Sequence, residues 1–183
     1  MQPDYHPLID TRDIQFKPAL CLDLDGTVRY SRRGKFINTP DDIVLFDGVE
    51  VKLWKYRFDG WLVCGVTNQG GVAFGIKTPD QEQAEIDYMF GLFDSNPFQL
   101  LQSCYHHEKG KHPAFGHRSL FRKPDIGMLA MLEYEAFNNN VVIDWNNSLF
   151  VGDRPEDEEC AKRAGIAFQW AWDFFGREKP TEE

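Results

Sequence analysis

The sequence predicts an α/β protein in which a parallel sheet is flanked by helices. Short apolar runs, each long enough for one buried strand, alternate along the chain with stretches of helical periodicity. The 183 residues and the 42% hydrophobic content suit one compact core. Because there is no internal repeat or long linker, we expect a single domain over 1–183, with 1–17 as an N-terminal extension and 176–183 as a C-terminal tail.

The first half of the chain predicts two strands and two helices in alternation. The apolar run 19–24 is a strand that ends in a tight turn at Asp25 and Gly26. Helical periodicity covers 49–58, and 61–66 is the second strand. Thr78, followed by proline and then by Gln81, is typical of a helix start, so we expect a helix from 79 to about 93.

The second half repeats this alternation. We expect strands over 100–105, 148–151 and 166–170, and helices over 124–137 and 155–164. The aromatic tail after residue 170 is expected to pack over a sheet edge.

The charge balance argues against broad binding of nucleic acids or anionic membranes. The formal net charge is -9, so the surface as a whole repels phosphate backbones. A cluster of basic residues follows the first predicted strand: Arg29, Arg32, Arg33 and Lys35. It is either part of a solvated loop or a site that attracts a small anion.

Cysteine usage and the absence of an apolar span predict a cytoplasmic protein with reduced thiols. The cysteines have no paired spacing, and they are Cys21, Cys64, Cys104 and Cys160. The first 17 residues contain no apolar signal region, and no stretch approaches the roughly 20 apolar residues of a membrane helix.

Polar segments follow the predicted strands, at the edge where open α/β sheets bind ligands. The segments are 23–27 (DLDGT), 67–69 (TNQ), 122–124 (RKP) and 152–154 (GDR), with Asp157 shortly after. Each alone could be a turn or a cap. Together they supply what phosphoryl transfer needs: an oxygen nucleophile, a proton donor, a metal site and donors to phosphate oxygens.

The residue types suggest roles within this set. Asp23 and Asp25 alternate along a strand, so one can attack phosphorus while the turn at Gly26 swings the other into place as a proton donor. Clustered carboxylates, completed by Asp153, suit Mg²⁺. Lys123 can pair with both the nucleophile and the phosphate, and the Thr67 hydroxyl can donate to a phosphoryl oxygen.

With these motifs, the chain resembles the haloacid dehalogenase-like (HAD) superfamily, subfamily IIIA, over roughly residues 19–165. The fuller forms DLDGTV, TNQGG and RKPD resemble the branch of histidinol-phosphate and heptose-bisphosphate phosphatases. This resemblance implies a single Rossmann-like domain with little or no cap domain. Loops must then select the substrate, and the candidates are 31–36, 70–77 and 106–118.

The resemblance also implies roles for individual residues. Asp23 would be the nucleophile and a metal ligand, Asp25 the general acid and base that binds metal through its carbonyl oxygen, and Asp153 the third ligand. Asp157 would orient the Asp153 loop rather than touch metal. The residues implied to hold the phosphoryl group or substrate are Thr67, Asn68, Arg122 and Lys123.

The sequence does not decide whether the loop before Arg122 holds zinc. Relatives in this branch often hold zinc through Cys-x-His followed by Cys-x-Cys, and Cys104 with His106 matches the first half. Ser119 and Phe121 stand where the later cysteines would be. Replacement ligands would have to come from His107, His112 or His117, and a zinc-free substrate loop is the other interpretation.

The sequence therefore predicts a Mg²⁺-dependent phosphohydrolase that cleaves a phosphate monoester of a small metabolite, such as a sugar phosphate, through an aspartyl-phosphate. One alternative is a catalytically retired protein that binds a phosphorylated ligand or partner. A polynucleotide 3'-phosphatase is a further alternative, although the acidic balance argues against it. A phosphorylated receiver domain fits poorly, because its motif order differs. The sequence leaves the oligomeric state open, and a monomer is compatible with it.

Overall fold

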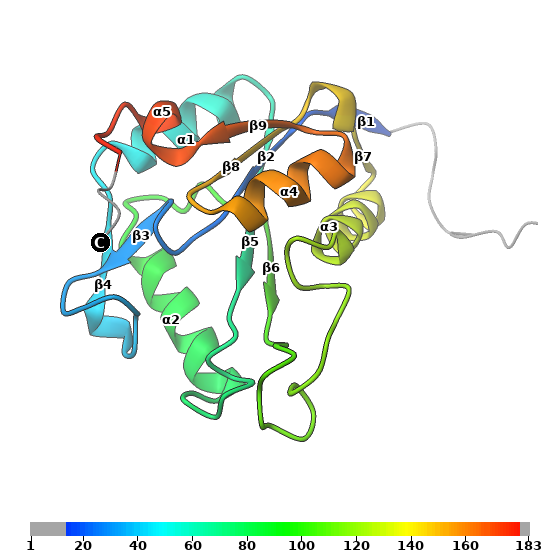
Figure 1. Ribbon diagram of the computed structural model, residues 1–183. Coiled ribbons are helices and arrows are strands. Elements are labelled where there is room, and N and C mark those ends of the chain that lie inside the picture. Colours follow the sequence, from blue (N-terminus) through cyan, green and yellow to red (C-terminus); the bar gives the residue numbers. More distant parts are fainter. Residues whose placement is uncertain (1–13, 180–183) are drawn as a thin grey trace, which may run out of the picture.

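The computed structural model describes residues 14–179, and its centre is a five-stranded parallel sheet in the order β6-β5-β2-β8-β9 (Figure 1). The strands are β2 (Ala19–Leu22), β5 (Leu62–Asn68), β6 (Leu100–Cys104), β8 (Leu149–Gly152) and β9 (Ala167–Trp170). The central strand, β2, is buried at every residue. The parallel α/β architecture expected from the sequence is confirmed.

Helices cover both faces of this sheet (Figure 1). One face packs against α3 (Gly127–Asn138) and α4 (Pro155–Ala164), and the other against α1 (Val49–Phe58), α2 (Pro79–Gly91) and α5 (Ala171–Phe175). The two cores alternate along β2, with Cys21 in the first core and Leu20 and Leu22 in the second. Burying each such leucine contributes roughly 1.5–3 kcal/mol.

Two small sheets were not expected from the sequence. In the first, β1 (Gln15–Lys17) pairs in parallel with β7 (Val141–Ile143). The expected N-terminal extension is therefore wrong for residues 15–17, which join the fold, whereas residues 1–13 lie outside the described part. In the second, β3 (Arg29–Ser31) pairs antiparallel with β4 (Ile43–Leu45). Short 3-10 helices cover Pro40–Asp42 and Trp145–Asn147.

Element boundaries differ from the expectation at some ends. The Thr78 side chain and Gln81 form the expected capping box of α2, but this helix ends at Gly91. α3 begins at Gly127 rather than at residue 124. The tail beyond β9 folds into α5, whose Phe174 is buried in the core on the α1 side.

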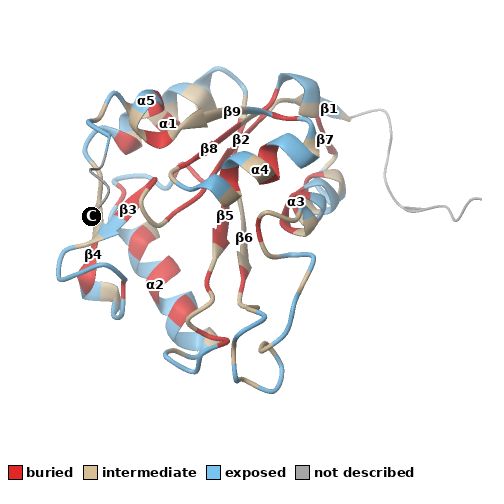
Figure 2. Cartoon of the chain, in the orientation of Figure 1, coloured by how far each residue is buried: buried red, intermediate tan, exposed pale blue. Residues whose placement is uncertain are grey.

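The polar segments identified above lie at one edge of the buried sheet, which is called the reactive edge below. Figure 2 shows buried residues concentrated on the strands and on the inward faces of the helices. The loops that follow the carboxyl ends of β2, β5, β6 and β8 lie at one edge, and they contain the polar segments identified above. None of the helices between residues 14 and 179 has the length and apolar composition needed to span a membrane.

Candidate active site

The Lys123 ammonium lies at the reactive edge of the sheet and pairs directly with Asp23. Its Nζ is 2.5 Å from Oδ1 of Asp23 and 2.7 Å from Oδ1 of Asp157, and it also donates to the carbonyl of Val66 at 2.7 Å. Burial alone would lower the pKa of Lys123, but the two carboxylates raise it above its ordinary value. The side chain is therefore a fixed cation beside Asp23, as expected from the sequence.

Asp23 is buried at the end of β2, where its backbone N–H donates to the carbonyl of Val151 on β8. Burial raises the pKa of Asp23 well above its ordinary range, Lys123 opposes this shift, and Asp157 and Asp153 add to it. Negative charge thus accumulates at this point beyond what one lysine offsets.

Asp153, in the turn after β8, approaches Asp23 because of a glycine. Gly26 has a φ of +94° and lies so close to Asp153 that a Cβ atom there would collide with the carboxylate. Burial, followed by the charge of Asp157, raises the pKa of Asp153 to about 6. Its Oδ1 is buried, and the described residues give it no hydrogen-bond partner. This is an oxygen that a cation would satisfy.

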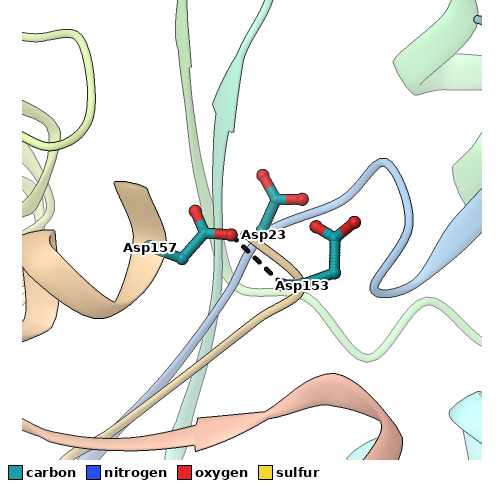
Figure 3. A group of neighbouring side chains, drawn as sticks. All are labelled: Asp23, Asp153 and Asp157. Carbon is teal, nitrogen blue, oxygen red and sulfur yellow. Dashed lines mark hydrogen bonds between the residues drawn. The ribbon is translucent and has the colours of Figure 1, made fainter. Parts of the chain in front are cut away.

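Asp157 has a different task from that of its two neighbours (Figure 3). Its Oδ2 accepts hydrogen bonds from the backbone N–H groups of Asp153 and Arg154, at 3.2 and 3.1 Å. Its other oxygen pairs with Lys123. Asp157 therefore holds the backbone of the Asp153 loop, which is the orienting role that the resemblance implied.

The donor set fits a magnesium ion. Ligand oxygens of Asp23, Asp153 and Asp157 lie within 4.8 Å of one another, and within residues 14–179 no other cluster of three acidic, histidine or cysteine side chains is this tight. Carboxylate oxygens with room for water are the ligands that Mg²⁺ prefers.

Asp25 is held by two side chains and lines a cavity beside the acidic cluster. Its Oδ1 is 2.7 Å from Nε of Arg29, and its Oδ2 accepts a 2.8 Å hydrogen bond from Nε2 of Gln69. Burial acts to raise the pKa of Asp25, but the charge and hydrogen bond of Arg29, together with Gln69, lower it.

Arg29 and Gln69 were not assigned roles from the sequence. Arg29 was grouped with a basic loop, yet it is fully buried, so neither solvation nor attraction of an anion applies to it. Its four-residue spacing from Asp25 was the available signal. Gln69 lies within the TNQ motif, and its Nε2 donates to Asp25 and to the hydroxyl of Thr67.

The remaining predicted residues lie near Lys123. Thr67 is buried at the end of β5. The Asn68 side chain exchanges two hydrogen bonds with the backbone of Lys123, from Nδ2 to the carbonyl at 3.1 Å and from the Lys123 N–H to Oδ1 at 3.0 Å. Asn68 thus positions Lys123. Arg122 lines the cavity and donates to the carbonyl of His106 at 3.1 Å.

The loop before Arg122, where a zinc site was left open, is held together by contacts between aromatic and histidine rings. Phe115 contacts the rings of Tyr105, His106 and His112, with centroid distances of 5.6, 5.4 and 4.9 Å. Sγ of Cys104 is 3.9 Å from Nδ1 of His106. In the described part of the chain, Cys104 and the histidines do not bring three ligand atoms together. These residues do not form a ready tetrahedral site.

Comparisons with known proteins agree with this geometry. The model of the family described as polynucleotide kinase 3 phosphatase matches residues 19–175. A D-glycero-D-manno-heptose-1,7-bisphosphate 7-phosphatase of Chlorobaculum tepidum is 29% identical over 150 residues, covering 81% of this chain and 75% of that protein. A D-glycero-beta-D-manno-heptose-1,7-bisphosphate 7-phosphatase of Yersinia pestis is 31% identical, covering 83% and 78%.

A solved structure gives the same result at the level of the fold. The D,D-heptose 1,7-bisphosphate phosphatase of B. bronchiseptica, complexed with magnesium and phosphate, superposes with a TM-score of 0.64 and is 26% identical, covering 82% of this chain and 78% of that one. The family model spans most of the chain, including every residue of the candidate site. The chain therefore belongs to the polynucleotide kinase 3 phosphatase family, within the haloacid dehalogenase-like phosphatases.

Proposed function

We propose that this protein is a Mg²⁺-dependent phosphatase that hydrolyses the phosphate monoester of a small metabolite through an aspartyl-phosphate on Asp23. The observation that carries the proposal is the contact of Asp23 with the buried ammonium of Lys123, beside an Asp153 whose carboxylate has an unsatisfied oxygen. Relatives that match most of this chain are named as phosphatases of a sugar bisphosphate.

In the first step, a carboxylate oxygen of Asp23 attacks phosphorus and the bond between phosphorus and the leaving oxygen breaks. Asp25 acts from its protonated form, which Arg29 and Gln69 disfavour at rest, and it gives its proton to that oxygen, so the product leaves as an alcohol. In the second step, Asp25 takes a proton from water, the water oxygen attacks phosphorus, and Asp23 is released with inorganic phosphate.

Neighbouring groups stabilise the charge that develops in both steps. Lys123 holds Asp23 in place and offsets the charge on the phosphoryl oxygens, and Thr67 can donate its hydroxyl to one of them. Asp23, Asp153 and the carbonyl of Asp25 would hold the Mg²⁺ ion, which supplies charge neutralisation for the phosphoryl group when bound. Arg122 lines the cavity, which supports a contact between its guanidinium and the substrate.

The test is hydrolysis of an aryl phosphate and of a panel of sugar phosphates, with Mg²⁺ and with a chelator. Asp23→Asn removes the nucleophile while keeping its size, so we expect a loss of at least about 10³-fold in kcat. Chelation should abolish the wild-type rate. Equal rates for wild type, variant and chelated enzyme would leave the retired, ligand-binding alternative as the better account.

A second candidate is a polynucleotide 3'-phosphatase, because the matching family model has that description. The net charge of -9 opposes binding of a phosphate backbone. We therefore expect an oligonucleotide 3'-phosphate to be hydrolysed more slowly than small phosphate esters, and a faster rate would favour this candidate.

We also propose that the protein acts as a monomer in the cytoplasm. In the described residues its four cysteines are free and buried, which suits a reducing compartment. Size-exclusion chromatography with light scattering measures the oligomeric state directly.

A further inference from the structure

The cavity beside Asp25 is much larger than a phosphate group requires. It has a volume of about 680 Å³, within the range of small-molecule sites. Asp25 and Asp153 are among its lining residues, and two segments, 30–38 and 70–77, form much of its wall. The space between these segments is where the alcohol part of a phosphate ester would lie.

Large apolar side chains line this space and remain exposed to solvent. They are Tyr30, Phe36, Phe74 and Ile76, with exposed fractions of 41, 61, 44 and 67%. They come from both segments, so each segment contributes apolar surface to the lining. A gathering of exposed apolar groups within one cavity marks a surface that a ligand covers.

Three polar side chains of the same segments are already engaged within the protein. The Ser31 hydroxyl donates to Asp42 at 2.6 Å, and Nδ2 of Asn38 donates to the carbonyl of Phe36 at 3.0 Å. Nζ of Lys77 is 2.6 Å from Oε2 of Glu85 and 3.2 Å from the carbonyl of Ile37. These three groups hold the wall in shape and are not free for a ligand, whereas Lys35, Arg122 and Arg154 are the cations of the lining that can meet phosphate charge.

Two of these rings have a neighbouring side chain within the protein. Phe74 packs against His107 with a centroid distance of 4.7 Å, which fixes one side of its ring. Nζ of Lys35 is 5.9 Å from the centre of the Phe36 ring. Exposed aromatic rings bind another ring by offset or edge contacts, which add to the effect of the area that is buried.

From the exposed apolar side chains of this lining we infer that the substrate is a phosphate monoester whose alcohol part carries an aromatic ring or a comparable flat apolar group. This group would bind against Phe36, Phe74 and Ile76. The inference rests on the proposed phosphatase function and names its substrate class. It separates this chain from relatives named for a sugar bisphosphate, although the reaction at phosphorus is the same.

The experiment compares 2-phenylethyl phosphate with glycerol 1-phosphate. Both are primary alkyl esters, so their intrinsic reactivities are similar and a difference in kcat/KM reports binding of the alcohol part. Transfer of a ring to an apolar wall is worth about 1.5–3 kcal/mol, so we expect kcat/KM for the phenylethyl ester to be higher by about 10-fold to 100-fold.

Matched variants locate the effect. Phe36→Ala and Phe74→Ala should each lower kcat/KM for the phenylethyl ester by roughly 5-fold to 20-fold, mainly through KM, and leave glycerol 1-phosphate within about 2-fold. Phe58→Ala is the control, because Phe58 is 82% exposed on α1 and does not line the cavity. Melting temperatures near that of the wild type would establish that the variants are folded.

The outcomes separate this inference from the proposed function. Equal or better hydrolysis of glycerol 1-phosphate and sugar phosphates, or no effect of Phe36→Ala and Phe74→Ala, would overturn the substrate class while phosphatase activity stands. Absence of hydrolysis for every ester in the presence of Mg²⁺ would overturn both.

Discussion

Arg29 has a larger role than an ordinary basic residue in a loop. It has no exposed surface, its Nε pairs with Asp25, and its Nη1 donates to the backbone carbonyl of Glu85 at 3.3 Å. Glu85 in turn pairs with Lys77 in the cavity wall. The carboxyl group proposed as acid and base is therefore fixed by a buried polar chain that also reaches a substrate loop.

Replacing Arg29 should affect substrates according to their leaving groups. In Arg29→Met, Asp25 is no longer fixed, so kcat/KM for an alkyl phosphate should fall by about 10²-fold, because its alcohol leaves only with a proton. The loss for 4-nitrophenyl phosphate should be much smaller, because that leaving group departs as an anion. Steady-state kinetics on both esters measures the difference.

The matched variant is Arg33→Met, because Arg33 makes its ion pair with Asp41 at the surface and should change neither rate. Arg29→Lys should recover part of the loss. Equal losses on the two esters would assign Arg29 a purely structural role.

At the scale of elements, α5 connects the end of the described chain to the first motif. Arg177 follows this helix, and its Nη2 donates to the carbonyl of Thr27 at 2.8 Å. Its guanidinium lies 3.9 Å from the centre of the Phe46 ring and 4.7 Å from that of Phe175. The turn after Asp25 is thus held from a position 150 residues away along the chain.

Arg177→Ala should weaken this contact in a measurable way. We expect the free energy of unfolding to fall by roughly 1–3 kcal/mol, since a charged hydrogen bond and ring contacts are lost. We also expect kcat to fall several-fold, because Thr27 lies within the turn that positions Asp25. Chemical denaturation and phosphatase assays check both values. Glu178→Ala, at the exposed neighbouring position, should change neither, and an identical effect there would contradict the proposed contact.

The sequence predicted the elements that carry the site better than the elements that frame it. β2, β5 and β8 are apolar runs followed at once by polar motifs, and this contrast is visible along the chain. β1, β3, β4 and β7 have three residues each, which is too short for periodicity, and their pairing depends on distant partners.

The same limit applies to single residues of the site. Asp23, Lys123 and Asp153 could be grouped because each follows a predicted strand or begins a predicted helix. Arg29 could not be separated from its basic neighbours, since its burial depends on the carbonyl of Glu85, which is 56 residues away. Asn68 could be placed at the site, but its two bonds to the Lys123 backbone depend on the path of the intervening loops.

For the whole molecule, the acidic cluster links stability to metal and pH. Burial and Asp157 raise the pKa of Asp153 to about 6, so the folded protein binds a proton there more tightly than the unfolded chain does. Without metal, this group's contribution to stability is present below the unfolded pKa of about 4 and is lost as pH rises to about 6. A cation that binds the ionised carboxylates reverses this loss.

Mg²⁺ should therefore raise the melting temperature more at pH about 7.5 than at pH about 5. Saturation at ten times Kd contributes about 1.4 kcal/mol, which corresponds to a shift of about 3–6 °C for a chain of this size. Differential scanning fluorimetry with Mg²⁺ and with a chelator measures the shift. Asp153→Asn should abolish it, and an undiminished shift in that variant would place the ion elsewhere.

The order of strands in the central sheet also has a consequence for synthesis on the ribosome. β2 precedes both of its neighbours in the chain and lies between β5 and β8, yet β8 begins only at Leu149. Until that segment emerges from the exit tunnel, one edge of the innermost strand has no neighbour and Asp23 lacks Asp153. Until then the nascent chain has neither the pairing of β2 with β8 nor a complete metal site, and both form together once β8 is available.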